Sequence, residues 1–437
     1  MSIQKAIRRL PGVKLKHHKN TADMETVRMP APKQVTIVMT QHLGAPCIPL
    51  VKVGDEVKLG QKIGENRDQL SAPIYSSVSG KVIALKDYTT FGGNSVPSVV
   101  IESDGLQTVS ETVKPPVIRT KEDFIQAVYE NGMVGLGGAG FPTHTKLSFE
   151  EGKVDTLIIN GAECEPYITS DNRELIENAS AIVKGIQQIQ TYLGIKKVII
   201  GIEDNKKQAL QLMGQLTDSI PEIQVMSLTS QYPQGAEKVL IYVTTGRVVK
   251  EGQLPADVGV IVMNVTSISK LGRYLETGMP LTAKRLTVDG DCIANPQNVR
   301  VPIGTSIQDV IDFCGGFTKE PKKIICGGPM MGVAIEDLST PIIKNNNAIL
   351  AFSKSMAELP ETTACIRCGK CSQVCPVRLM PRSLEIAYDA GNAEALQKLS
   401  VNLCINCGCC SYICPAKRNL AQKNQLAKEL VKKATKK

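Results

Sequence analysis

The chain of 437 residues contains no tryptophan, and aromatic residues make up only 4% of it. Its hydrophobic cores must therefore be built from aliphatic side chains. No uninterrupted apolar run approaches the roughly 18 residues that a membrane-spanning helix requires, and the best candidate, residues 258–265, has the length of a buried strand. The basic N-terminus leads into no apolar stretch, so a secretory signal is not expected. These absences predict a cytosolic chain.

Histidine is scarce as well. The four histidines, His17, His18, His42 and His144, show no metal-ligand spacing, and no Ser-His-Asp arrangement is recognisable, so hydrolytic chemistry is not expected. The hydrophobic share of 42% and the charged share of 21% are ordinary for a globular protein and exclude wholesale disorder. At roughly 100–200 residues per domain, the length suggests three or four domains.

The net charge of +9 is concentrated at the two ends of the chain. Residues 1–20 contain six Lys or Arg and no acid, and residues 417–437 contain eight Lys or Arg and one Glu, which leaves the remaining body slightly acidic. Two interpretations stay open: the ends attach the protein to an anionic partner or membrane surface, or they are solvated tails that aid solubility. A nucleic-acid partner is not indicated, because the basic residues form no groove-like cluster.

Two segments are rich in short strands. Residues 33–115 alternate apolar runs with Gly-Asp, Gly-Gln and Ser-Gly turns, which predicts an all-β module. The phrases VKVGDEVKLGQKIG and SSVSGKV resemble the barrel-sandwich of lipoyl and biotinyl carrier domains. The modifiable lysine tripeptide of those carriers is missing, so we expect a structural role. Residues 271–350 combine short strands with Gly-Pro turns and suit a compact β-grasp unit.

The other two segments contain helices. Residues 116–270 alternate apolar strands with helices, which indicates an open α/β sheet that binds ligands at the carboxyl ends of its strands. The last segment is helical and cysteine-rich. We predict a multidomain fold of α/β and β units: an N-terminal extension with a barrel-sandwich hybrid (1–115), an α/β domain (116–270), a β-grasp domain (271–350) and a helical ferredoxin-like domain with a basic tail (351–437).

Nine of the fourteen cysteines lie in the last 73 residues. In a chain without a secretory signal, dense cysteines indicate a metal site before disulfides. The spacing C-x2-C-x2-C-x3-C-P occurs twice with an offset of 39 residues, and eight of the twelve positions in the two copies are identical. This spacing is that of bacterial ferredoxins with two [4Fe–4S] clusters.

In such a run the first three thiolates bind one cluster, and the fourth binds the other cluster. One cluster is therefore expected on Cys365, Cys368, Cys371 and Cys414. The second is expected on Cys404, Cys407, Cys410 and Cys375. Two zinc sites are the alternative, but zinc modules use paired C-x2-C knuckles. Cys409 is not expected to be a ligand, because its use would break the register of the repeat.

A glycine-rich segment follows the first predicted helix of the α/β domain. It contains Gly135, Gly137, Gly138 and Gly140, with Lys146 downstream. It lacks the ending of a P-loop and the preceding strand of a Rossmann fingerprint, and such runs are often only tight loops. Clustered glycines nevertheless let backbone N–H groups approach a phosphate or a planar ring, with the lysine as counter-charge.

Polar residues follow the apolar strand at residues 157–159. Asn160, Glu163 and Glu165 come at the carboxyl end of this strand, where an α/β sheet places its ligand-binding groups. Two carboxylates and an amide suit ribityl hydroxyls or a nicotinamide amide. A solvated acidic loop is the alternative.

Several motifs together resemble one family. The segments GLGGAGFPTHTK (135–146), NGAECEP (160–166) and YPQGAEKVLI (232–241), with the doubled cysteine motif, look like the RnfC protein of the Rnf-type electron transport complex, a membrane-bound, ion-translocating NAD:ferredoxin oxidoreductase. The resemblance covers nearly the whole chain, including the N-terminal HHKN. The central part is similar to the flavin- and NADH-binding subunit of respiratory complex I.

The resemblance implies FMN, NAD(H) and two [4Fe–4S] clusters. It implies that the glycine loop covers FMN and the dinucleotide, that Lys146 lies near phosphate, and that Glu165, the expected catalytic residue, lies near the nicotinamide. The remaining implied cofactor contacts are Phe141 and Phe149 at the adenine, Asn160 and Glu163 at the flavin, Asn264 at the FMN phosphate, and Glu203 at the end of a neighbouring strand. Leu136 departs from the pattern, because complex I has an arginine there.

The resemblance also implies a function. The chain would be a peripheral subunit on the cytoplasmic face of the cell membrane, exchanging hydride between NADH and FMN and passing single electrons through its clusters. Its partners would be other subunits of the complex, including a further iron–sulfur subunit, with ferredoxin reached through the complex. The alternatives are a flavin and iron–sulfur cobalamin reductase, which the N-terminal barrel-sandwich argues against, a flavin-free iron–sulfur docking subunit, and a soluble ferredoxin-type regulator, for which the chain is needlessly long.

Overall fold

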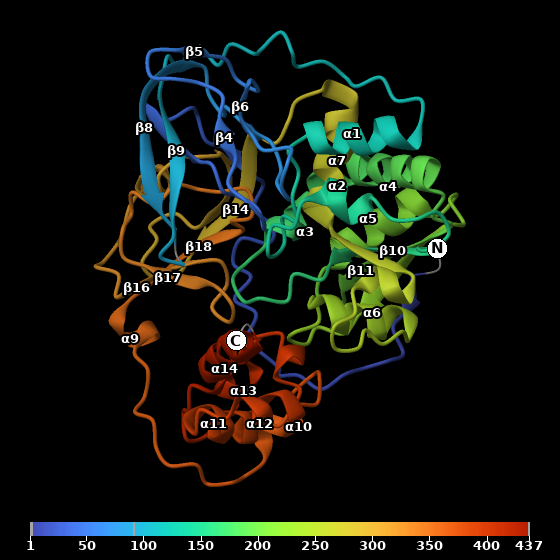
Figure 1. The fold of residues 1–437 in the computed structure, drawn as a ribbon, viewed down its shortest axis with the longest axis vertical. Helices are drawn as coiled ribbons and strands as arrows, with labels where there is room; N and C mark the ends of the chain where they lie inside the picture. The colour runs from blue at the N-terminus through green and yellow to red at the C-terminus, as the bar shows by residue number, and fades with distance from the viewer. Residues whose placement is uncertain (1–2, 91, 436–437) are drawn as a thin grey trace.

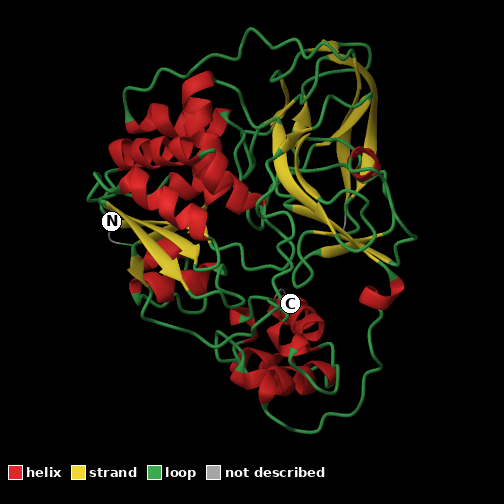
Figure 2. Ribbon diagram, turned by 180° about the vertical axis from the view of Figure 1, so that it is seen from behind, coloured by secondary structure: helices red, strands yellow, loops and turns green. Residues whose placement is uncertain are grey.

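The computed structural model describes residues 3–90 and 92–435. Within these ranges the strands form four sheets, and the C-terminal segment is helical. In Figure 1 a β-rich half and an α/β half lie side by side, and the C-terminal helices lie below them. Figure 2 shows most helices gathered around a single sheet or in the C-terminal unit. No helix in the described part of the chain is long and apolar enough to cross a membrane.

The β-sandwich unit (residues 34–103) consists of two antiparallel sheets. Their facing sides enclose an aliphatic core that includes Ile37, Ile63, Val82 and Ile101. The first sheet has the order β3 (Gln34–Val38), β9 (Ser95–Ser103), β8 (Gly80–Thr89) and β5 (Glu56–Val57), and the second has the order β4 (Ile48–Pro49), β6 (Lys62–Glu65) and β7 (Ile74–Tyr75).

The α/β unit (residues 121–277) is built on a sheet in which all strands are parallel. Its order is β1 (Gln4–Lys5), β12 (Ile223–Leu228), β11 (Lys197–Glu203), β10 (Thr156–Gly161) and β13 (Val260–Asn264). The central strands are buried on both faces, which explains their continuous apolar sequences.

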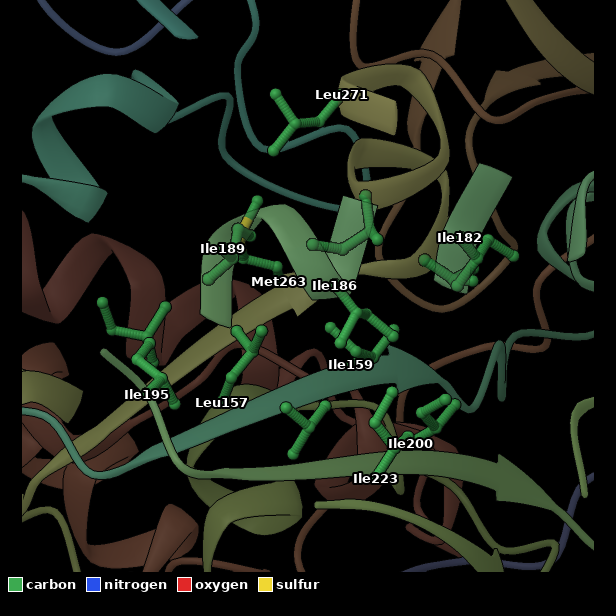
Figure 3. Close-up of a cluster of buried hydrophobic side chains, with 14 of the residues drawn as sticks. Leu157, Ile159, Ile182, Ile186, Ile189, Ile195, Ile200, Ile223, Met263 and Leu271 are labelled. Atoms are coloured by element: carbon green, nitrogen blue, oxygen red, sulfur yellow. The ribbon is translucent and has the colours of Figure 1, made fainter. Parts of the chain in front are cut away.

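Helices cover both faces of this sheet. Alternate residues of β10 and β11, such as Leu157 and Ile200, point toward Ile182 and Ile186 of α4 (Figure 3). The opposite face packs against α6. The helices are α1 (Lys121–Glu130), α2 (Thr143–Leu147), α3 (Ser170–Glu177), α4 (Ala179–Leu193), α5 (Lys207–Thr217), α6 (Glu237–Thr245) and α7 (Val265–Thr277), with the 3-10 helix η1 (Pro255–Val258) before β13.

The strand order reverses direction beside β10. The chain steps from β10 to β11 and then to β12, and afterwards returns to place β13 on the other side of β10. Asn160 and Asn264, the last polar residues of these two strands, are partners in the register. A ligand of an open α/β sheet binds outside the carboxyl ends of the strands at such a reversal.

The mixed-sheet unit (residues 283–352) follows. Its core includes Leu286, Val299, Val310 and Ile349. The sheet has the order β17 (Val333–Ile335), β16 (Lys323–Cys326), β18 (Ala348–Phe352), β14 (Ala283–Asp289), β15 (Gln297–Pro302) and β2 (Val27–Arg28), and it packs against α8 (Ile307–Phe313).

The N-terminal arm (residues 3–29) belongs to neither the β-sandwich unit nor a sheet of its own. Its first strand, β1, extends the α/β sheet beside β12, and its second, β2, extends the mixed sheet beside β15. The expected first domain, which joined this extension to the barrel-sandwich, therefore contains a segment that connects two other units.

The cluster unit (residues 365–435) reproduces its sequence repeat in its backbone. Arg367, Gly369 and Arg378 have positive φ angles of 58°, 73° and 56°, and the residues 39 positions later have angles of 52°, 78° and 51°. A linker that contains α9 (Lys354–Ala357) leads into it. Its helices are α10 (Lys370–Gln373), α11 (Pro381–Asp389), α12 (Ala393–Lys398), η2 (Val401–Leu403), α13 (Cys409–Tyr412) and α14 (Leu420–Thr435).

Candidate functional site

The two asparagines at the sheet reversal fix the loops around them. The amide nitrogen of Asn160 donates to the carbonyl oxygen of Gly235 at 2.8 Å. Asn264 caps α7: its Oδ1 accepts from the backbone N–H of Thr266 at 2.9 Å, and its Nδ2 donates to Asp171 at 2.7 Å. These bonds hold the carboxyl ends of β10 and β13 and the amino end of α7 in one rigid edge.

The glycine loop (residues 135–140) lies directly on this edge. A Cβ atom at Gly137 would come within 2.6 Å of the Asn264 side chain, whereas one at Gly138 would meet nothing within 4 Å. The first position therefore requires glycine for close approach, and the second faces open space. The loop also contacts the other units, because Asn345 donates to the Gly138 carbonyl and Leu43 N–H donates to the Gly140 carbonyl.

Lys146 does not extend into open space in this arrangement. Its ammonium donates to the carbonyl of Val262 in β13 at 3.0 Å and pairs with Glu237 of α6 at 3.2 Å.

The two aromatic residues expected at an adenine ring lie in different surroundings. Phe141 closes the glycine loop through its backbone pairing with Gly135, and Phe149 packs against the α/β core with Lys121 over its ring.

The carboxylate loop (residues 163–168) follows β10. Glu163 has a φ of 49°, and its carboxylate accepts from the backbone N–H groups of Asp171 at 2.6 Å and Asn172 at 3.1 Å, in the first turn of α3. Burial raises the pKa of Glu163. Its side chain therefore secures the loop to the first turn of α3.

Glu165 is turned toward the mixed-sheet unit. Its Oε2 accepts from the backbone N–H of Met330 at 3.0 Å, and a Cβ at Gly328 would come within 2.4 Å of its carboxyl carbon. Burial raises the pKa of Glu165 to about 7. A segment that belongs to a different sheet therefore holds this carboxylate.

Glu203 is fully buried at the end of β11 rather than exposed at the edge. It pairs with Lys206 at 3.1 Å, and Lys206 donates in turn to the carbonyl of Ala162 at 2.6 Å. Glu203 thus supports Ala162, the residue just before the carboxylate loop, through Lys206.

The eight cysteines of the sequence repeat line two cavities in the cluster unit. Within the described residues, no three His, Cys, Asp or Glu side chains converge on a point suited to a single metal ion. The first cavity, of about 220 Å³, is lined by Cys365, Cys368, Cys371 and Cys414. The second, of about 20 Å³, is lined by Cys404, Cys407, Cys410 and Cys375, and also by the extra thiol Cys409. Of the eight repeat cysteines, each cavity combines the first three of one copy with the fourth of the other.

The second cavity lies against the α/β unit. Cys407 and Cys409 share a buried cluster with Tyr232, against which Cys164 and Met330 also pack. The extra thiol, Cys409, approaches the carbonyl of Tyr232 at 3.9 Å. Since Cys164 belongs to the carboxylate loop, the sheet edge and the second cavity share a wall.

Three residues of this region were missed from sequence. Lys19 donates to the carbonyls of Glu163 and Glu165, Asp171 joins Asn264 to α3, and Lys206 supports Ala162. Lys19 lies in the HHKN stretch, which carried a signal only through the family resemblance. The other two had no signal for these contacts, because Asp171 bonds to a side chain 93 positions away and Lys206 supports a backbone carbonyl 44 positions away.

Comparisons with known proteins agree with this arrangement. Residues 8–106 match the RnfC barrel sandwich hybrid domain, residues 128–273 the Nuo51 FMN-binding domain, residues 285–334 the SLBB domain, and residues 361–418 the 4Fe-4S dicluster domain. Fold and site thus define a flavin- and iron–sulfur-binding protein of electron transfer. The matches to an FMN-binding domain and a 4Fe-4S dicluster domain confirm the expected cofactors, FMN and two [4Fe–4S] clusters.

The chain belongs to the RnfC family of ion-translocating oxidoreductase complexes, which confirms the resemblance. The corresponding protein in the Na⁺-translocating ferredoxin:NAD⁺ oxidoreductase complex of Acetobacterium woodii is 45% identical over 359 residues, or 81% of each chain. Its counterpart in the proton-translocating complex of Clostridium ljungdahlii is 44% identical, over 84% of this chain and 81% of that protein. The counterpart in the ion-translocating oxidoreductase complex of Rhodobacter capsulatus is 40% identical, over 95% and 82%.

A solved structure shares the fold at low sequence identity. An NAD⁺-reducing [NiFe]-hydrogenase in the air-oxidised state superposes with a TM-score of 0.51 at 19% identity, over 71% of this chain and 62% of that chain.

Proposed function

We propose that this chain is the NADH-oxidising, NAD⁺-reducing subunit of an ion-translocating ferredoxin:NAD⁺ oxidoreductase complex, and that it lies peripherally on the cytoplasmic face of the cell membrane. The observation that carries the proposal is the shared wall between the sheet edge and the second cysteine cavity, formed by Cys164, Tyr232 and Met330. A flavin site and a cluster site in contact allow electrons to pass within one chain.

The residues present fit the expected groups. The glycine loop and the amino end of α7 offer backbone N–H groups and the positive end of a helix dipole, which suit the phosphate of FMN. We assign Asn160 and Glu163 to the flavin, and Lys146 and Glu203 to a supporting role one layer below. The adenine of NAD(H) would lie near Phe141 and Phe149. Bound FMN supplies the conversion between a hydride and single electrons.

Glu165 is the residue that we assign to the nicotinamide. Its anchor on Met330 holds the carboxylate at the junction of three units. A fixed carboxylate of this kind orients a substrate rather than transferring a proton, because hydride chemistry at a flavin needs no protein acid or base. The residue's contribution would therefore be to position NAD(H) against the flavin.

We infer the order of the clusters from the positions of the two cavities. The cluster on Cys404, Cys407, Cys410 and Cys375 would be proximal to the flavin, and the cluster on Cys365, Cys368, Cys371 and Cys414 would be distal. Cys368 is exposed, whereas the second cavity is enclosed against the α/β unit. Electrons would therefore leave near Cys368 toward a further iron–sulfur subunit, and ferredoxin would be reached through the complex.

Cofactor analysis of the anaerobically purified chain tests the proposal. We expect the iron and sulfide of two [4Fe–4S] clusters and one FMN per chain, and addition of NADH should bleach the visible absorbance of both. Zinc or no metal at the cysteines would contradict the proposal. Intact clusters without any capacity to bind FMN would instead indicate a docking subunit that only carries electrons.

A further inference from the structure

The N-terminal arm runs past the carboxyl edge of the α/β sheet. Val13 pairs through its backbone with Tyr232, and His17 accepts a hydrogen bond from the backbone N–H of Tyr167 at 2.9 Å. The ring of His18 stacks on that of Tyr167, with centroids 4.8 Å apart and planes 7° apart. The arm therefore contacts the carboxylate loop over several consecutive residues.

Lys19 makes the central contact between the arm and the loop. Its ammonium donates to the carbonyl oxygens of Glu163 and Glu165, both at 2.8 Å, and to that of Ile168. An ammonium has three hydrogens, and all three are used on one loop that lies 144 to 149 positions away in the sequence. Three carbonyl oxygens that converge on one point repel each other unless a cation lies between them.

The carboxylate loop needs such an external support. Glu163 and Tyr167 have φ angles of 49° and 69°. These angles lie in the left-handed region of the backbone, which residues other than glycine rarely adopt. Conformations of this kind persist only where surrounding contacts impose them. The contacts that impose this one come from the arm through Lys19 and from α3 through the Glu163 carboxylate.

The same loop carries groups on both sides of the proposed electron path. Glu163 is bonded to the first turn of α3, Cys164 packs against the second cysteine cavity, and Glu165 is anchored on Met330. A shift of the loop would displace all three together. The residue that fixes its backbone therefore acts on the site without touching a ligand.

We propose that Lys19 is a positioning residue of the flavin and nucleotide site, which holds the carboxylate loop in its binding conformation and places a positive charge beside it. This inference rests on the proposed function. A positive charge near a bound flavin favours the more negative, reduced form and raises its midpoint potential. The arm is thereby a part of the site rather than a flexible extension.

The test compares substitutions of Lys19 in the full chain, with its clusters in place and its flavin removed and added back. Lys19→Met keeps the stem and loses the charge and the donors. We expect its Kd for FMN to rise at least ten-fold, the flavin midpoint potential to fall, and the iron and sulfide contents to stay unchanged. Lys19→Arg, which keeps charge and donors, should restore most of the affinity and the potential.

Arg247→Met is the matched control. Arg247 binds Asp155 and the carbonyls of Val258 and Gly259 at the amino ends of β10 and β13, the opposite edge of the same sheet. It should lower thermal stability and leave the Kd for FMN within two-fold. If it weakens FMN binding as much as Lys19→Met does, the effect is a general loss of stability and the inference is wrong.

The remaining outcomes distinguish a failure of this inference from a failure of the proposed function. A wild-type chain that keeps its clusters and binds no FMN would overturn both. A wild-type chain that binds FMN, beside a Lys19→Met variant with the same Kd and potential, would overturn the inference alone. If the methionine variant does not fold, Lys19→Gln provides the same comparison, because it keeps two donors without the charge, and wild-type behaviour would again overturn the inference.

Discussion

Glu165 illustrates how a single side chain links two units. Its carboxylate accepts from Met330 of the mixed-sheet unit while its backbone is fixed by Lys19. We expect Glu165→Ala to lower NADH oxidation at least ten-fold, because the substitution removes the group assigned to the nicotinamide and the acceptor for the half-buried N–H of Met330. Iron and FMN contents should not change. Steady-state turnover with an artificial acceptor measures the effect, and Glu151→Ala, at an exposed carboxylate, is the control.

Cys375 is the residue that distinguishes crossed from local cluster ligation. It lines the cavity of Cys404, Cys407 and Cys410, although it belongs to the other copy of the repeat. Cys375→Ala should therefore damage the proximal cluster and leave the distal one, and Cys414→Ala should do the reverse. Iron analysis and EPR of each reduced variant report which signal is lost. Loss of the signal of the 365–371 cluster in Cys375→Ala would disprove the crossed arrangement.

At the scale of elements, one carboxylate joins α11 to the segment around the start of α14. Glu385 is buried and contacts Arg418, Arg382 and Lys423. Burial alone would raise its pKa, but the hydrogen bonds from these cations lower it to about 2. Such a shift from 4.5 corresponds to stabilisation on the order of 3 kcal/mol at pH 7.

Glu385→Gln should therefore destabilise the cluster unit by about 3 kcal/mol at neutral pH. Because the pKa is lower in the folded state, the stabilisation is complete above pH 4.5 and is lost as the pH falls toward 2. The difference in the free energy of unfolding between wild type and Glu385→Gln should stay constant between pH 7 and 5 and become smaller below pH 5. Urea unfolding under anaerobic conditions measures it. Glu394→Gln, in an exposed pair with Lys398, should change stability little, and equal midpoints for wild type and Glu385→Gln would refute the prediction.

Patterns of local origin were predictable from sequence at the scale of elements. The cysteine spacing carries the repeat because a cluster dictates the distances between its ligands, and Asn160 follows an apolar run that could only be a buried strand. Partners far apart in the chain could not be predicted. The contacts of Lys19 with Glu163 and of Glu165 with Met330 join segments more than 140 positions apart. Glu203 was expected to contact the cofactor only because of the family resemblance, and its burial against Lys206 is not visible in the sequence.

At the scale of the whole molecule, the clusters connect an enclosed site to a free surface. The proximal cavity packs on the α/β unit, and the distal cavity opens beside an exposed segment that contains Ile366, Arg367, Cys368 and Lys370. Ile366 is 67% exposed. An exposed apolar residue followed by two cations is suited to a partner with an acidic face, because opposite charges steer association and apolar contact then stabilises it.

The double variant Arg367→Glu, Lys370→Glu tests this exit. With NADH as donor and at low ionic strength, it should reduce the anionic acceptor ferricyanide several-fold more slowly and the cationic acceptor hexaammineruthenium(III) faster, because the local potential changes sign near the distal cluster. Added salt should remove both effects, since the Debye screening length is only about 10 Å at 0.1 M ionic strength. The double variant Lys81→Glu, Lys86→Glu makes the same change of net charge on exposed lysines of the β-sandwich unit and should leave both rates near those of wild type. Equal rates in the two double variants would mean that electrons leave the protein somewhere other than beside Cys368.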